Sequence, residues 1–309
     1  MSYFPLLRGK QFELVSLREN SELISAWDIS PIIEPVRDSL PPLIRALRAL
    51  DEAGASAWVI ANPVVGSLKG KQLHEEQSEL SRLVEESANI GWIYQVSDES
   101  HLAGLANFLE NFGGGVLHHG KVASAEVAAA MEGGRVPAPA FNFYREQCGD
   151  RYRSKFGGIP AVAIEDGFKK QPKNSLYPED EVFSDLVLVY RGRGFIGFGD
   201  YLVVGDDYSE GGGPALAVAI HITYKNANDD GAVHIKHFVS DSNDTPENTA
   251  GKFKEALDKL VAAVLVDGSM ISRTSAINEF IDLSNSGHFP GLGYVKKLAI
   301  QHHLELMGE

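Results

Sequence analysis

The chain has 309 residues, of which 44% are hydrophobic, and a formal net charge of −14 at pH 7. This length allows one large barrel-type domain or two ordinary ones. The negative charge argues against general nucleic-acid binding, which requires a basic surface, and the single cysteine excludes an internal disulfide framework or a cysteine-based zinc site.

The N-terminal segment predicts a protein that stays in the cytoplasm. Arg8 and Lys10 come too early for a signal peptide, and no uncharged apolar stretch is long enough to span a bilayer. The single cysteine is also typical of a reducing compartment.

Short apolar runs alternate with helix-like segments through the first half of the chain. Continuous apolar runs are typical of strands buried on both faces, and alternation with helices at this spacing predicts parallel βαβ units. The expected strands are 3–8, 30–36, 57–62, 91–96, 115–119, 138–143 and 160–165. The expected helices between them are 11–19, 41–50, 73–88, 100–112 and 124–131. The pattern predicts an α/β fold of the TIM-like (β/α) barrel type.

The pattern changes after residue 144. Three β-type runs, 197–204, 215–224 and 233–239, predict an antiparallel meander that would distort the barrel, and the turn residues at 228–231 join the last two. A clear amphipathic helix is expected at 249–265, followed by further C-terminal helices.

The predicted organisation is a single barrel-like domain over residues 1–309. It would contain regular βα units over 1–144, an irregular part with the meander over 145–248 and C-terminal helices over 249–309.

Carboxylates stand at or near the ends of several apolar runs. The C-terminal strand ends of a (β/α) barrel gather at one mouth, so Glu34, Asp166 and Asp200 are candidate catalytic residues. Three carboxylates could hold Mg²⁺ or Mn²⁺, or divide acid and base roles between them. The alternative is that each one caps a helix or pairs with a basic side chain such as Arg8 or Lys10.

Five residues are candidates for binding a substrate or a small anionic ligand. All lie in or beside predicted strands or at the first strand end: Arg8, Lys10, Asn62, Asn142 and Tyr201.

His221 is the fourth candidate catalytic residue, as a general acid or base. On a strand it faces the same side as Ala219 and Thr223, so it has room for a ligand, although a buried, hydrogen-bonded histidine is the alternative. Strand alternation allows His237 to lie near it, and two histidines with a carboxylate would suit a transition metal.

Three other features leave alternatives open. His118 and His119 lie on opposite faces of their strand, so at most one can reach the barrel mouth, and Cys148 has no obvious base nearby to make it a nucleophile. The glycine-rich acidic segment 206–213 could be a lid or a partner contact, or only a long connection.

Several segments together resemble a known family. They are Tyr3-Phe4-Pro5-Leu6-Leu7-Arg8-Gly9-Lys10, Pro31-Ile32-Ile33-Glu34-Pro35, Gly199-Asp200-Tyr201, Ala217-Val218-Ala219-Ile220-His221-Ile222-Thr223-Tyr224 and His237-Phe238-Val239-Ser240-Asp241. In this order they resemble the "beta protein" family of bacteria, phages and satellite phages. The resemblance implies a role in phage defence or in neutralising a toxic neighbour, and it supplies no catalytic residues.

Three hypotheses follow. The first is a binding protein of a phage-defence or toxin–antitoxin-like locus that holds a partner protein or a small ligand at the barrel rim, where the acidic charge would suit a basic partner. The second is a metal-assisted phosphodiesterase or other hydrolase that uses the carboxylates and His221. The third is an oligomeric scaffold.

Overall fold

The computed structural model describes residues 2–120, 128–129, 131, 137–210 and 216–309. The chain forms two compact units, which are interleaved in the sequence. The first comprises Met1–Glu165 and Val189–Asp200, and the second comprises Asp166–Leu188 and Tyr201–Glu309. The single domain expected from the sequence, with its internal boundaries at 144 and 248, stays a prediction.

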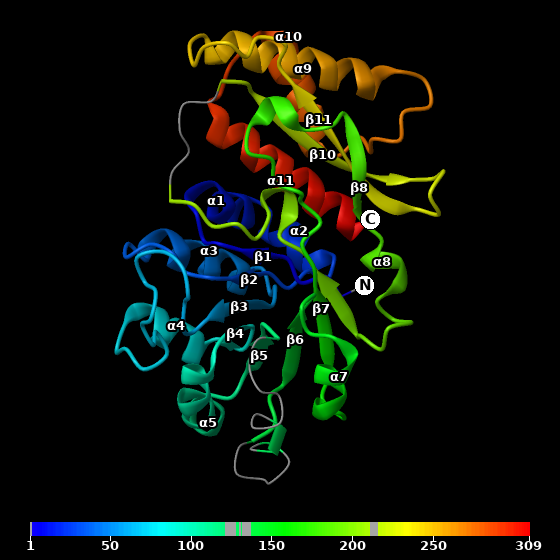
Figure 1. Ribbon diagram of the computed structural model, residues 1–309. Coiled ribbons are helices and arrows are strands. Elements are labelled where there is room, and N and C mark those ends of the chain that lie inside the picture. The colour runs from blue at the N-terminus through cyan, green and yellow to red at the C-terminus, as the bar shows by residue number, and fades with distance from the viewer. Residues whose placement is uncertain (1, 121–127, 130, 132–136, 211–215) are drawn as a thin grey trace. The chain divides into compact units, whose positions relative to one another are not determined.

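The first unit contains an eight-stranded parallel sheet. The strands are β1 (Leu6–Leu7), β2 (Ile32–Ile33), β3 (Ala57–Ile60), β4 (Ile90–Val96), β5 (Gly115–His118), β6 (Phe141–Arg145), β7 (Ala161–Ile164) and β9 (Gly197–Gly199). They pair in the order β1-β2-β3-β4-β5-β6-β7-β9 (Figure 1). This sheet curls into a nearly closed barrel, so the prediction of a TIM-like (β/α) barrel is confirmed.

The chain closes the barrel by bringing its first strand against its last. Tyr3 forms a parallel bridge with Phe198, and the Phe4 amide donates to the Phe198 carbonyl at 2.8 Å. A Cβ atom on Gly199 would lie 1.9 Å from the Phe4 carbonyl oxygen, so only glycine permits this approach. The sequence prediction that 197–204 begins a meander is therefore wrong, because residues 197–199 pair with β7 in parallel.

Helices lie on the outer side of this sheet, as Figure 1 shows for α3, α4 and α5. Among the described residues, the first unit contains the helices α1 (Gln11–Glu19), α2 (Ser21–Ala26), α3 (Pro41–Glu52), α4 (Glu79–Glu86), α5 (Leu102–Asn111) and α7 (Asp150–Arg153). In α3, proline occupies the first turn, where its missing N–H costs nothing, and one face buries Leu43, Leu47 and Leu50. Each buried leucine stabilises the fold by roughly 1.5–3 kcal/mol.

Two predicted helices differ from the described structure or lie outside it. The helix expected at 73–88 is shorter, because the Ser78 side chain accepts from the Ser81 amide at 3.2 Å and caps the N-terminus of α4. The helix expected at 124–131 lies mostly outside the described residues.

Aromatic side chains fill part of the barrel interior. The ring of Phe143 lies 5.5 Å from that of Phe4 and 5.9 Å from that of Trp58. Alternate residues of a strand share one face, so this packing places Phe141, Phe143 and Arg145 on the inner face of β6. The apolar filling therefore gives way to polar residues toward the C-terminal strand ends.

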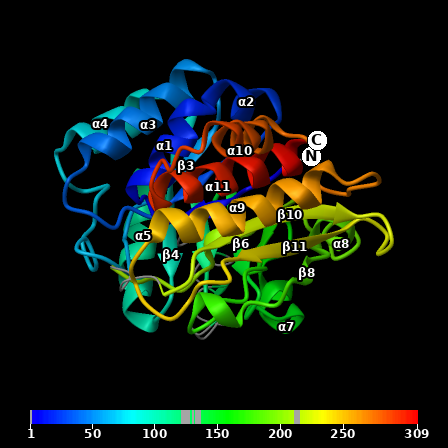
Figure 2. The same ribbon diagram turned by 90° about the horizontal axis from the view of Figure 1, so that it is seen from above.

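The second unit contains an antiparallel sheet in the order β10-β11-β8. The strands are β8 (Asp180–Ser184), β10 (Ala219–Asn226) and β11 (Ala232–Val239), and the helices are α9 (Thr249–Leu265), α10 (Ser275–Ser286) and α11 (Leu292–Gly308). Figure 2 shows the three helices side by side. Ile220, Ile222 and Phe280 belong to the core that they share with the sheet. The turn predicted at 228–231 and the helix predicted at 249–265 are both confirmed.

A short helix, α8 (Leu186–Val189), leads from the second unit back toward β9. Among the described residues, no helix has the length and apolar character needed to cross a membrane.

Candidate functional site at the C-terminal ends of the barrel strands

Each of the eight barrel strands has a polar residue within two positions of its C-terminal end. In strand order these residues are Arg8, Glu34, Asn62, Gln95, His119, Arg145, Glu165 and Asp200. Six of them are at least nine-tenths buried: Arg8, Glu34, Asn62, Gln95, His119 and Asp200. Burial of so many polar groups is costly unless each is hydrogen-bonded, so their contacts decide what the site can do.

Glu34 is the centre of the network. It is fully buried, and its Oε2 forms an ion pair with Nη1 of Arg8. Its Oε1 accepts from the Val64 amide at 2.8 Å and from Gln95 Nε2 at 3.0 Å. The carboxylate charge is thus compensated from three sides. Removing one partner of a buried pair typically costs 3–5 kcal/mol, because the other charge is left uncompensated.

Asn62 and Gln95 lock each other in place. The Asn62 side chain donates to the Gln95 carbonyl at 2.9 Å and accepts from the Gln95 amide at 2.8 Å. Gln95 Nε2 also donates to the Asn62 carbonyl at 3.0 Å. The side-chain Nε2 of Gln95 thus uses both of its N–H groups, one on Glu34 and one on Asn62. Its side-chain Oε1 is left as an acceptor.

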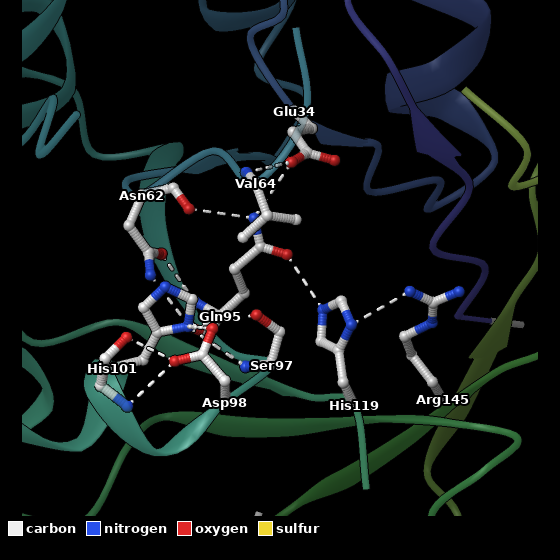
Figure 3. A network of polar contacts seen from close by, with 10 residues as sticks. Glu34, Asn62, Val64, Gln95, Ser97, Asp98, His101, His119 and Arg145 are labelled. Atoms are coloured by element: carbon white, nitrogen blue, oxygen red, sulfur yellow. Dashed lines mark hydrogen bonds and ion pairs between the residues drawn. The ribbon is translucent and has the colours of Figure 1, made fainter. Parts of the chain in front are cut away.

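The two hydrogen-bond partners of His119 determine which of its ring nitrogens carries the proton. Its Nε2 lies 2.9 Å from Oε1 of Gln95, an acceptor, so Nε2 carries the proton. Its Nδ1 lies 3.1 Å from Nη1 of Arg145, a donor, so Nδ1 accepts. Figure 3 shows the resulting chain from Arg145 through His119 and Gln95 to Glu34. All these hydrogen bonds run in one direction, from a guanidinium to a carboxylate.

Asp200 and Lys10 have other roles. Asp200 accepts from the Tyr3 hydroxyl at 2.7 Å, and burial together with this carboxylate raises the pKa of Tyr3 well above its usual range. The backbone N–H groups of Arg8 and Lys10 donate to Glu13 at the start of α1, at 2.9 and 3.3 Å. In this contact Lys10 acts through its backbone.

Asn142 faces away from the barrel interior, because it alternates with the inward-facing residues of β6. Its Oδ1 lies 3.0 Å from Nε2 of His118, whose ring stacks on Tyr144. Burial lowers the pKa of His118 to about 4. Ligand binding by Asn142 stays a prediction, and in the structure its partner is His118. Of the two adjacent histidines, His119 alone joins the network of Gln95 and Glu34, in agreement with the prediction that at most one reaches the mouth.

Cys148 lies in the same outer layer. Its thiol donates to the His118 carbonyl at 3.2 Å, and burial raises its pKa to about 12. A thiol of this kind is a poor nucleophile.

The remaining predicted site residues belong to the second unit. Asp166 accepts from the amides of Phe168 and Asp206, at 2.9 and 2.8 Å, and so fastens a turn. Tyr201 is buried. His221 pairs with His237, as strand alternation predicts, with the two Nδ1 atoms 2.7 Å apart.

A metal site made by three carboxylates stays a prediction, since Glu34 and Asp200 belong to the first unit and Asp166 to the second. Glu34, Asp166 and Asp200 each have separate partners, and within the described ranges no group of three or more histidine, cysteine or acidic side chains has a metal-binding arrangement.

Gln95, His119 and Arg145 belong to the network but are not among the candidate residues that the sequence predicts. A signal was available for each, since continuing the two-residue alternation from Ile93, Leu117 and Phe143 places them on the inner face. Gln95 and His119 lie at the ends of strands that the sequence predicts. Arg145 lay two residues beyond the predicted end of its strand.

The fold and the network together define a TIM-like barrel with a buried, charged hydrogen-bond chain at its C-terminal strand ends. Comparison with models of known protein families gives no match, and comparison with curated proteins gives none either.

Proposed function

We propose that this protein acts by binding, as a component of a phage-defence or toxin-neutralising locus, and that the C-terminal mouth of the barrel is its binding site. The single observation that carries the site is the buried chain from Arg145 through His119 and Gln95 to Glu34 and Arg8. The resemblance to the "beta protein" family supports the biological role.

The physical argument rests on the free-energy cost of burying charged and polar groups. A barrel interior can be filled by apolar side chains, as the aromatic residues of this barrel show, and replacing buried ion pairs by such residues is often neutral or stabilising. The presence of charged and amide groups at the C-terminal end of the barrel is therefore best explained by a role in binding a ligand or in catalysis.

The chemistry of the chain favours an anionic group as the target. Arg145 and Arg8 place guanidinium groups at its two ends, and guanidinium matches carboxylate and phosphate groups geometrically. The target could be an acidic side chain of a partner protein or a small anion. No contact among the described residues favours the metal-assisted hydrolase over binding.

The test is phage plating on cells that carry the native locus, together with growth of cells that express the neighbouring gene of the locus. The variant is Arg145→Met, and the matched control is Arg48→Met, whose exposed guanidinium pairs with Glu79 on the surface. Circular dichroism and thermal melting first establish that both variants fold.

Loss of protection by Arg145→Met, with protection retained by Arg48→Met, supports binding at the mouth. Full protection by a folded Arg145→Met protein overturns the mouth as the site. A wild-type protein that neither protects against phage nor restores growth overturns the defence role.

A further inference from the structure

The second unit contains a pocket that is lined by residues of this unit. Its volume is about 260 Å³, larger than the roughly 150 Å³ cavity that is known to hold benzene. Its walls combine apolar side chains with a few polar ones, which is typical of small-molecule sites. The residues that line it include Phe168, Lys170, Tyr177, His221 and Lys296.

A hydrogen-bond relay stands behind one wall of this pocket. His237 Nε2 lies 3.2 Å from Oε1 of Glu181, and the other oxygen of Glu181 pairs with Lys169 at 3.2 Å. The carboxylate accepts, so His237 carries its proton on Nε2 and its Nδ1 is an acceptor. His221 must then donate from its own Nδ1, 2.7 Å away.

This relay leaves one atom for a ligand. With its proton on Nδ1, His221 presents Nε2 as an acceptor, and His221 is a wall residue of the pocket. Burial and the neighbouring His237 lower the pKa of His221 to about 3, so the ring stays neutral near pH 7. A neutral imidazole acceptor of fixed tautomer suits a hydroxyl donor.

Aromatic rings hold the relay in position. The Tyr177 ring stacks on His237 with centroids 4.7 Å apart, and it meets His221 edge-on at the same distance. Phe168 meets His221 edge-on at 5.0 Å. These contacts restrict rotation of both imidazoles and add apolar surface for a ligand ring.

Two lysines give the pocket a positive side. Lys170 comes from the loop after β7, and Lys296 comes from α11. Lys170 Nζ lies 3.9 Å from a carboxylate oxygen of the exposed Asp207, a contact that is weak in water.

We propose that this pocket binds a small organic anion that has a ring-sized apolar body and a hydroxyl group. The lysines attract the anionic group, the apolar wall holds the body, and His221 Nε2 accepts from the hydroxyl. The anionic group is a carboxylate or a phosphate ester.

The experiment is isothermal titration calorimetry of the full-length protein with matched probes. Benzoate and phenyl phosphate test the two anionic groups, benzyl alcohol is the uncharged comparison, and 3- and 4-hydroxybenzoate add the hydroxyl. We expect at least one anion to bind more tightly than benzyl alcohol. At least one hydroxybenzoate should gain about 2- to 10-fold over benzoate, the value of a typical net hydrogen bond.

Variants assign the contacts. Lys296→Met should weaken anion binding at least 5-fold, whereas Lys254→Met, on the exposed face of α9 where it pairs with Asp258, should not. His221→Phe should abolish the gain from the hydroxyl and leave benzoate binding in place.

Tighter binding of benzoate or of phenyl phosphate supports the pocket and identifies the anionic group. Failure of every anion to bind overturns the proposal, as does an unchanged affinity in the folded Lys296→Met protein. Arg145→Met should leave these affinities unchanged, which separates this pocket from the barrel mouth.

Discussion

The hydroxyl of Tyr3 donates a 2.7 Å hydrogen bond to Oδ1 of Asp200, across a separation of 197 residues in the sequence. The bond joins the segment that leads into the first strand of the barrel to the residue that follows its last strand, and both side chains are buried. Closure of the barrel is thus supported by a side-chain contact as well as by the backbone pairing of Phe4 and Leu6 with Phe198 and Asp200.

Tyr3→Phe should lower the free energy of unfolding by about 1.5–3 kcal/mol, the range for a hydrogen bond to a charged group. Urea denaturation followed by circular dichroism measures this. Tyr190→Phe is the control, because its hydroxyl accepts from the exposed Arg191 at 2.9 Å, and it should cost clearly less. Equal losses for the two variants would show that the Tyr3–Asp200 bond has no special role in closure.

Gly199→Ala should prevent close pairing of β9 with the first strand, since the new methyl would lie 1.9 Å from the Phe4 carbonyl oxygen. We expect a loss of about 3 kcal/mol or more, as for severe overpacking. Gly157→Ala is the matched control, because its φ is −58° and nothing lies within 4 Å of the added atom. A melting temperature for Gly199→Ala equal to that of the control would contradict the described closure.

Gln95→Glu should destabilise the protein strongly at pH 7, because it places a second carboxylate where Gln95 Nε2 donates to Glu34 at 3.0 Å. The expected loss is about 3–5 kcal/mol, as for an uncompensated buried charge. Stability relative to wild type should recover in part as the pH is lowered, since protonation of one carboxyl restores a donor.

The surface offers a control for this change. Gln147 also donates to a glutamate, Glu146, at 3.2 Å, but both are exposed, so Gln147→Glu should change stability by less than about 0.5 kcal/mol. If Gln95→Glu behaves like Gln147→Glu, then the mouth network is more open to water than the buried contacts indicate.

Acidification should destabilise the protein through its buried histidines. Burial lowers the pKa of both His118 and His302 to about 4 in the folded state, whereas an unfolded histidine titrates near 6.5. Below about pH 6.5 the unfolded state therefore binds the proton first, and stability falls as the pH drops toward 4. Above pH 6.5 these groups cause no pH dependence.

Each histidine contributes a slope of up to about 1.4 kcal/mol per pH unit within this window. Urea denaturation between pH 7.5 and 4.5 measures the total, and His118→Gln should reduce the slope by one histidine's share. An unaltered slope in both His118→Gln and His302→Gln would mean that other groups govern acid unfolding.

The parts of this structure that follow from local patterns could be predicted from the sequence. The buried parallel strands were recognisable as apolar runs, and the α9 bounds coincide with the predicted amphipathic helix. The pairing of His221 with His237 followed from alternation within two strands joined by a strong turn.

The pairing of strands that lie far apart in the sequence was harder to predict. Residues 197–199 and 219–226 look alike as β-type runs, yet one joins the barrel and the other forms the antiparallel sheet. Which sheet a β-type run joins depends on the strand that lies beside it in the folded chain. The residues of the run itself do not determine this pairing. The site was incomplete for a related reason, since Gln95 and Arg145 gain meaning only when the strand ends come together.

The interleaving of the two units has a consequence for synthesis on the ribosome. The contact that closes the barrel is the bridge between Tyr3 and Phe198, so about two thirds of the chain must emerge before the barrel can close. Until then the outer edge of β1 has unpaired backbone groups, which can pair with other chains. Residues 166–188, meanwhile, emerge before the rest of their own unit. Slowing translation after residue 200 should therefore favour correct assembly of the barrel, whereas a chain truncated before residue 197 should be prone to aggregation.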